Sequence, residues 1–212
     1  VGNVTAMLQK EFFLEKPVWI VPQAFGGNEW WEREPTPQEM RAMTYLALIN
    51  GASGIQYFIR QGLNAFPKST IAWNECGAMA LEVAELTPYL FSTEKAPQLK
   101  SSDKDLQYRV IGIDGAVLVL VVNPDKKPFP VSFTLEGLPY SGSAAVMFEN
   151  RMVEVREGRI EDIIDAFGTR AYLVRYKMPS GKGPKVQPQN LVLDPSFENT
   201  TGTGIPASCY AR

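Results

Sequence analysis

Hydrophobic and polar positions follow one pattern in the first part of the chain. An unbroken apolar run from residue 18 to residue 21 is typical of a strand that is covered on both faces. Next, Thr36-Pro37-Gln38-Glu39 combines a capping threonine, a first-turn proline and a capping-box glutamate, so it predicts a helix that ends near Asn50-Gly51. A second strand, Gly54 to Ile59, and a helix of about residues 74 to 86, closed by Pro88, follow. This alternation predicts parallel strands joined by right-handed crossovers.

The pattern changes to short β-type runs after residue 106. Turn-forming pairs and glycines separate these runs, among them Asp114-Gly115, Gly137 and Gly158. In one run Glu154 and Arg156 alternate with apolar residues, which is typical of a strand with one solvated face. These features predict an antiparallel β-sandwich. The predicted strands are Gln107–Asp114, Ala116–Asn123, Phe129–Leu135, Ala144–Glu149, Met152–Arg156 and Ala171–Tyr176.

These patterns divide the chain into four segments. Residues 1–95 form the β/α part, residues 96–177 the sandwich, and residues 178–189 a linker rich in proline, glycine and lysine. Residues 190–212 are too few for a core of their own, so they are interpreted as the beginning of a further module. Two parallel strands with two helices leave strand edges unpaired. We therefore expect another polypeptide segment, or another chain, to complete the β/α part. The sandwich is expected to support it through Leu86, Tyr89, Leu90 and Phe91.

Composition and charge exclude several kinds of partner. With 45% apolar residues, a chain of 212 residues can bury a substantial core. Its 21 basic and 23 acidic residues are dispersed, so we expect no strong field that would hold nucleic acid or anionic lipid. The longest apolar runs, such as residues 116 to 122, are too short to cross a bilayer. The sequence therefore predicts neither a nucleic-acid partner nor a membrane partner.

The available side-chain chemistry is narrow. The chain contains no histidine, which removes the commonest general base and metal ligand and leaves carboxylate, tyrosine or lysine chemistry. Cys76 and Cys209 lie far apart, so they form neither a zinc knuckle nor a redox pair, and we expect no metal site and no cofactor. Asn3-Val-Thr5 and Asn199-Thr-Thr201 are glycosylation acceptors, and they favour a secreted, extracellular protein.

Three stretches resemble known carbohydrate-active proteins. The sequences "KPVWIVPQAFGG", "PTPQEMRAMTYLALINGASGIQYF" and "WNECGAMALEVAELTPYLFS" are similar to the closing strands and helices of glycoside hydrolase (β/α)8 barrels, which many members extend with a small β-sandwich. The stretch "GTRAYLVRY" resembles the end of that sandwich, and "NLVLDPSFENTTGTGIPASCYAR" looks like the first strand of a jelly-roll carbohydrate-binding module. The resemblance implies the last two β/α units of such a barrel, incomplete in this chain, with a carbohydrate partner.

The resemblance also places a candidate site. Such barrels bind substrates at the C-terminal ends of their strands, and in the largest related clan the nucleophile leaves strand seven, where this chain has Gln23. An amide cannot form a glycosyl ester or activate water. Three explanations remain open. The nucleophile is Glu29 or Glu32 in the following loop, both carboxylates lie in upstream strands while Gln23 binds a sugar hydroxyl, or the barrel binds glycan without cutting it.

Further side chains near these strand ends are candidates for sugar binding. Tryptophans in the loop after the first strand could offer flat apolar faces, on which sugars stack. Either Tyr57 or Phe58 should point inward, because strand side chains alternate. Trp73 either closes the barrel end or borders the cleft, whereas Trp19 is expected in the core. The candidate substrate-binding residues are Gln23, Trp30, Trp31, Tyr57, Arg60, Gln61 and Trp73.

Together these features predict the C-terminal part of a secreted glycoside hydrolase-like protein that acts on or binds polysaccharide or oligosaccharide. At least part of the catalytic carboxylate pair would lie outside this chain, so the isolated chain would be inactive. The alternative is a non-catalytic glycan-binding or structural protein on a glycosidase scaffold, with Gln23 at the expected nucleophile position.

Overall fold

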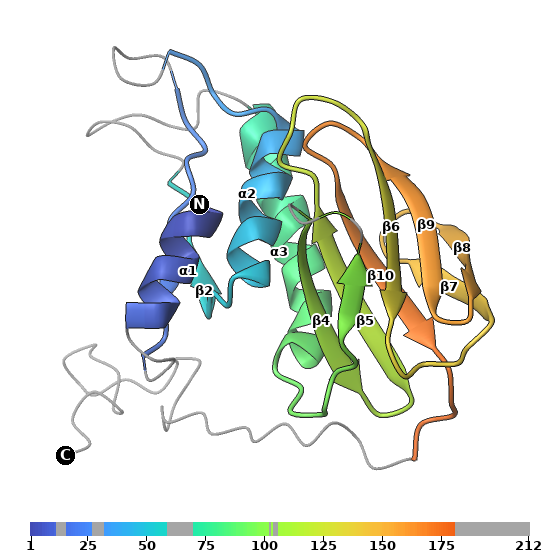
Figure 1. Ribbon diagram of the computed structural model, residues 1–212. Coiled ribbons are helices and arrows are strands. Elements are labelled where there is room, and N and C mark those ends of the chain that lie inside the picture. Colours follow the sequence, from blue (N-terminus) through green and yellow to red (C-terminus); the bar gives the residue numbers. More distant parts are fainter. Residues whose placement is uncertain (12–15, 27–31, 59–69, 102, 104–105, 181–212) are drawn as a thin grey trace, which may run out of the picture.

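The computed structural model describes residues 1–11, 16–26, 32–58, 70–101, 103 and 106–180 (Figure 1). The chain is of mixed α/β type, with three helices and a small parallel sheet followed by a large antiparallel sheet. The predicted module start at residues 190–212, and most of the predicted linker, lie outside the described residues. No helix in the described ranges has the length and apolar character needed to span a membrane.

The helical part contains α1 (Gly2–Glu11), β1 (Trp19–Ile20), α2 (Pro37–Ile49), β2 (Gly54–Ile55) and α3 (Thr70–Leu90). The two strands are parallel, with Trp19 opposite Gly54 and Ile20 opposite Ile55. A parallel bridge between Gln23 and Phe58 extends the same register. The predicted parallel pairing is confirmed, although the regular strands are shorter than expected. Helix α1 was not among the predicted elements.

Helix α2 begins and ends where the sequence predicted. The Thr36 hydroxyl accepts a hydrogen bond from the Glu39 amide, and the Glu39 carboxylate accepts one from the Thr36 amide at 2.8 Å. This is the reciprocal capping box that the spacing predicted. At the other end Asn50 caps the helix and Gly51 has a φ of 87°, a left-handed conformation that glycine adopts without steric cost.

Helix α3 runs past the predicted stop. It extends to Leu90, with Pro88 inside its last turn. A proline there removes only one hydrogen bond near the helix end. Tyr89 and Leu90 beyond it pack against the core between the helices and the large sheet. The apolar contacts of these residues therefore outweigh the missing bond.

The expectation that the first strand is covered on both faces is wrong. Val18 and Ile20 pack against Ala47 of α2, whereas Trp19 is 63% exposed and Val21 is 55% exposed. Successive strand side chains point to opposite faces, and within the described residues only the helix-facing side of β1 is covered. Within the described residues Trp19 is therefore exposed, contrary to the prediction of a core residue. Its indole ring lies against Gly54, where an added Cβ would come within 2.6 Å of the ring.

The second part is one antiparallel sheet of eight strands in the order β3-β6-β9-β8-β7-β10-β5-β4. The sheet curls into a near-closed barrel or sandwich around a shared apolar interior, in which Phe133 and Tyr172 lie with ring centroids 5.7 Å apart. The antiparallel prediction is confirmed, while β3 and β9 were missed. The strands are β3 (Leu99–Ser101), β4 (Gln107–Ile113), β5 (Ala116–Val122), β6 (Phe129–Leu135), β7 (Gly142–Val146), β8 (Arg151–Arg156), β9 (Arg159–Ile164) and β10 (Thr169–Arg175).

Strand β5 joins the two parts because it is buried on both faces. Val117, Val119 and Val121 face the interior of the large sheet. The alternate residues, among them Leu118 and Leu120, face the apolar layer shared with α2 and α3. The predicted supporting role of Leu86, Tyr89 and Leu90 is confirmed, whereas Phe91 is exposed.

A polar contact also ties the sheet to the end of α2. Arg109 of β4 donates a hydrogen bond from Nη1 to the backbone oxygen of Leu48 at 2.8 Å. A cation at the C-terminal end of a helix interacts favourably with the helix dipole. Burial lowers the pKa of Arg109.

Candidate functional site

The C-terminal ends of β1 and β2 form a short rim. The Phe58 amide donates to the Pro22 oxygen, and the Ala24 amide donates to the Phe58 oxygen, both at 2.9 Å. The rings of Phe25 and Phe58 meet edge to face with centroids 4.8 Å apart. The parallel pairing thus continues to the point where Gln23 and Phe58 leave the sheet side by side.

The face of these strands that points away from the helices is open. By strand alternation it carries Trp19, Val21 and Gln23 from the first strand, and Gly54, Gln56 and Phe58 from the second. Phe58 is 50% exposed, and Gln56 is exposed as well. In a (β/α)8 barrel this face would line the interior, where side chains from alternate strands pack in layers. These six residues offer aromatic and amide groups but no carboxylate.

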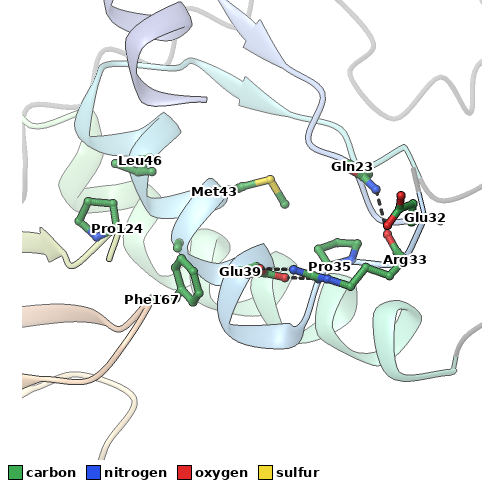
Figure 2. Close-up of a pocket in the computed structure, with 10 residues that line it drawn as sticks. Gln23, Glu32, Arg33, Pro35, Glu39, Met43, Leu46, Pro124 and Phe167 are labelled. Carbon is green, nitrogen blue, oxygen red and sulfur yellow. Dashed lines mark hydrogen bonds and ion pairs between the residues drawn. The ribbon is translucent and has the colours of Figure 1, made fainter. Parts of the chain in front are cut away.

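The Gln23 side chain hydrogen-bonds the backbone of its own loop. Its Nε2 donates to the backbone oxygen of Phe25 at 2.6 Å and to that of Arg33 at 3.4 Å, the second being weak (Figure 2). Both acceptors are carbonyl groups, which a carboxylate at position 23 could not satisfy because it has no hydrogen to donate at neutral pH. These two donated hydrogen bonds explain why an amide, rather than a carboxylate, occupies the end of the strand.

An ion pair fixes the end of this loop onto α2. Arg33 donates from Nη1 and Nη2 to the two carboxylate oxygens of Glu39, each at 2.7 Å. The Arg33 hydrogen bond is the largest cause that lowers the pKa of Glu39 to about 2, and burial partly opposes it. Two-pronged arginine–carboxylate pairs constrain orientation as well as distance.

This pair predicts an acid-dependent loss of stability. Because the pKa of Glu39 is lowered in the folded state, its contribution is fully present above about pH 4.5 and is lost as the pH falls toward about 2. We expect Glu39→Gln to weaken the pH dependence of the unfolding midpoint in this window. Urea denaturation followed by circular dichroism between pH 2 and pH 6 measures it, with exposed Glu136→Gln as the control.

If the wild-type chain and Glu39→Gln lose stability in parallel on acidification, the ion pair is not responsible.

A cavity of about 490 Å³ lies beside the rim, between the loop, α2 and the large sheet. Figure 2 shows its polar end at Gln23 and Glu32 and its apolar end at Leu46 and Phe167. Phe167 has a φ of 53°, which is uncommon for a bulky residue and aims its ring from the β9–β10 turn toward α2. The lining residues are Gln23, Glu32, Arg33, Pro35, Glu39, Ala42, Met43, Leu46, Pro124 and Phe167.

Tyr57 lies on the helix side of its strand. Its hydroxyl hydrogen-bonds Thr44 of α2, and its ring packs beside Met40 and Ala24. Burial raises the pKa of Tyr57 to about 12, so the phenol stays protonated at neutral pH. Phe58 is the strand residue on the open face, and alternation from Gly54 is the signal that could have identified it. A substrate contact by Tyr57 stays a prediction.

Some of the other candidate residues are exposed in the described part of the chain, and the rest lie outside it. Glu32 is exposed at the polar end of the cavity, and Trp73 is exposed on the first turn of α3. Asn3 is exposed on α1. In the described ranges no group of three potential metal ligands occurs. Glu29, Trp30, Trp31, Arg60, Gln61 and Asn199 lie outside the described residues.

Comparisons with known proteins give structural matches only. No family model matches the sequence, and no curated protein is similar to it in sequence. A noncanonic maltogenic alpha-amylase from Thermotoga neapolitana superposes with a TM-score of 0.55 at 7% identity, over 82% of this chain and 46% of that one. An alpha-amylase from Geobacillus thermoleovorans, solved with acarbose, gives 0.50 at 17% identity, over 68% of this chain and 34% of that one.

The similarity concerns the fold. A GH30 endoxylanase from Clostridium papyrosolvens gives a lower TM-score of 0.46 at 12% identity, over 82% of this chain and 46% of that one. The chain thus spans less than half the length of these solved chains. It is structurally similar to glycoside hydrolase chains over part of their length.

Proposed function

We propose that this chain is the C-terminal part of a glycoside hydrolase-like protein that acts on or binds polysaccharide or oligosaccharide. The observation that carries the proposal is the parallel β1–β2 pair, whose open face ends in Gln23 and Phe58 at a rim. The structural similarity to two alpha-amylases supports the same scaffold.

Exposed apolar surfaces support completion by further β/α units. Trp19 and Val21 lie uncovered on the open strand face, Val4 and Met7 on α1, and Leu81, 76% exposed, on α3. Soluble proteins rarely leave several large apolar patches uncovered. Parallel strands beside β1 and β2, with helices outside them, would cover all three surfaces. An upstream barrel segment is the simplest source, and another chain is the alternative source.

Catalysis then requires carboxylates from outside the described strands, because hydrolysis of a glycosidic bond uses a pair of them. Gln23 would shape the rim through its hydrogen bonds to Phe25 and Arg33 rather than attack the sugar. Phe58 would offer an aromatic edge or face to a sugar ring. We also propose an extracellular location, supported by the exposed acceptor Asn3.

The second candidate is a glycan-binding protein without catalysis. The observation that favours it is the engagement of Gln23 with backbone carbonyls at the position where the related clan carries its nucleophile. In that protein the open face would hold carbohydrate through aromatic and amide side chains alone.

The test compares the intact source polypeptide with this 212-residue chain on a panel of α-glucans and xylans. We expect the intact protein to release reducing ends, and the isolated chain to release none. Gln23→Ala in the intact protein should lower kcat/KM by roughly tenfold, since the loss of a rim hydrogen bond costs about 1 to 1.5 kcal/mol. The exposed Gln38→Ala is the control and should leave the rate unchanged.

Turnover by the isolated chain would contradict the proposal. Glycan binding by the intact protein without hydrolysis would favour the second candidate.

A further inference from the structure

The cavity beside the rim adjoins the contact between α1 and α2. Helix α1 contacts α2 where Gly2 approaches Leu46 and Asn50. A Cβ added at Gly2 would lie 3.1 Å from Asn50 Nδ2 and 3.4 Å from Leu46 Cδ2, so the two helices are closely packed there. Leu46 also lines the cavity. One side chain therefore belongs to both the helix contact and the cavity.

The direction of α1 points its first turn toward the cavity. Gly2 lies beside the turn that contains Leu46 and Asn50, whereas Gln9, further along α1, hydrogen-bonds the Gly51 oxygen after the end of α2. The two helices thus run in the same sense, and Figure 1 shows the N-terminus at the end of α1 that is nearer the middle of α2. Met43 and Glu39 come one and two turns before Leu46 on α2, at about 5.4 Å per turn.

The chemistry of the cavity suits a helix in that position. Met43, Leu46, Pro124 and Phe167 provide an apolar floor and side wall. Glu32 and the Arg33–Glu39 ion pair lie at the polar end, so the net charge is negative where a helix running in the same sense as α1 would have its N-terminus. Negative charge is favourable beside the N-terminal end of a helix dipole.

We propose that this cavity is filled by an α-helix that continues α1 by about two turns on the N-terminal side of Val1. A residue one turn before Gly2 packs on Met43, and the next turn lies over Glu39, with its amide groups toward Glu32. That a segment upstream of Val1 supplies this helix rests on the barrel completion proposed above. The position of the helix in the cavity rests on the α1–α2 contact and on the lining of the cavity.

Disulfide trapping in the intact protein tests the helix directly. Met43→Cys is combined with a cysteine at each of the eight positions before Val1, in a background with Cys76→Ser and Cys209→Ser. Disulfides form when the two Cα atoms are about 4.4 to 6.8 Å apart. Mild oxidation followed by mass spectrometry should give a maximum one turn before Gly2 and a repeat of three to four residues. Leu81→Cys, on α3 and outside the lining of the cavity, is the matched control and should give no such pattern.

A pattern without helical period, or the same yield with Leu81→Cys, would overturn the proposal. A bond between two copies of the protein at Met43→Cys would also overturn it, because the occupant would then be a second copy.

A second test changes Met43 itself and measures thermal stability, without introducing cysteines. Met43→Asp should lower Tm of the intact protein by roughly 5 °C or more, since it would bury a charge under the helix. In the 212-residue chain Met43 packs on Ala24 and Met40 but is only partly buried beside the cavity, so the shift should be smaller. Equal shifts in both proteins would contradict the proposal. If the intact protein hydrolyses glycan but forms no helical disulfide pattern, only the helix in the cavity is refuted. If the disulfides form but no glycan is hydrolysed, only the catalytic proposal is refuted.

Discussion

Replacing Leu118 by alanine is expected to lower the free energy of unfolding by about 3 to 4 kcal/mol, because the change leaves a cavity between β5 and the helices. Leu118 is fully buried in the apolar layer that also contains Tyr45 of α2 and Leu86 of α3. Urea denaturation at neutral pH measures the change. Leu81→Ala is the matched control, since it makes the same substitution at a side chain that is 76% exposed, and we expect a change below about 0.5 kcal/mol.

The same experiment tests whether the two parts unfold together. All four tryptophans precede residue 74, so their fluorescence reports the helical part, whereas hydrogen exchange of the β5 and β10 amides, followed by mass spectrometry, reports the large sheet. Coincident transitions in the wild-type chain and in Leu118→Ala would show one cooperative unit. Separate midpoints, or a loss in Leu118→Ala no greater than in Leu81→Ala, would contradict the shared core.

Replacing Asp162 by alanine should destabilise the large sheet by about 3 kcal/mol, because it removes the most buried of the carboxylates that pair with Arg151 and Arg170. Asp162 accepts hydrogen bonds from Arg151 Nη2 at 2.7 Å and from the Tyr172 hydroxyl at 2.9 Å. Arg170 is 11% exposed, and its Nε lies 3.8 Å from Asp162. Burial acts to raise the pKa of Asp162, but the hydrogen bond from Arg151 and others hold it below its ordinary value.

The neighbouring Glu161→Ala provides the control on the same strand. Glu161 pairs with Arg159 at the surface, where both side chains are well exposed, and such pairs contribute little to stability. Thermal and urea unfolding should separate the two variants clearly. If the two variants lose equal stability, the Asp162 network is no more than a surface feature.

The predictions succeeded where local chemistry decides the structure. Helix α2 follows from Thr36, Glu39 and Gly51, whose hydrogen bonds and backbone freedom act within a few residues. The parallel pairing of β1 with β2 follows from the strand–helix order. These features need no knowledge of what lies elsewhere in the molecule.

The misassigned features depend on distant packing or on an interrupted apolar pattern. The exposure of Trp19 depends on which elements cover its strand face, which a short apolar run does not reveal. Strand β9 was missed although Gly158 was identified as a turn residue, because the charged residues Arg159, Glu161 and Asp162 interrupt the apolar pattern of the strand. Gln23 was interpreted through its position in a resembling barrel, whereas its hydrogen bonds to two carbonyls appear only in three dimensions.

The contact between Trp19 and Gly54 has a consequence for related sequences. The indole occupies the space where a side chain at position 54 would stand, so the two neighbouring positions share one volume. Relatives should then exchange the pair together, with a smaller residue at position 19 wherever position 54 carries a side chain. Such covariation would mark this layer of the open face as tightly filled in every member that keeps the fold.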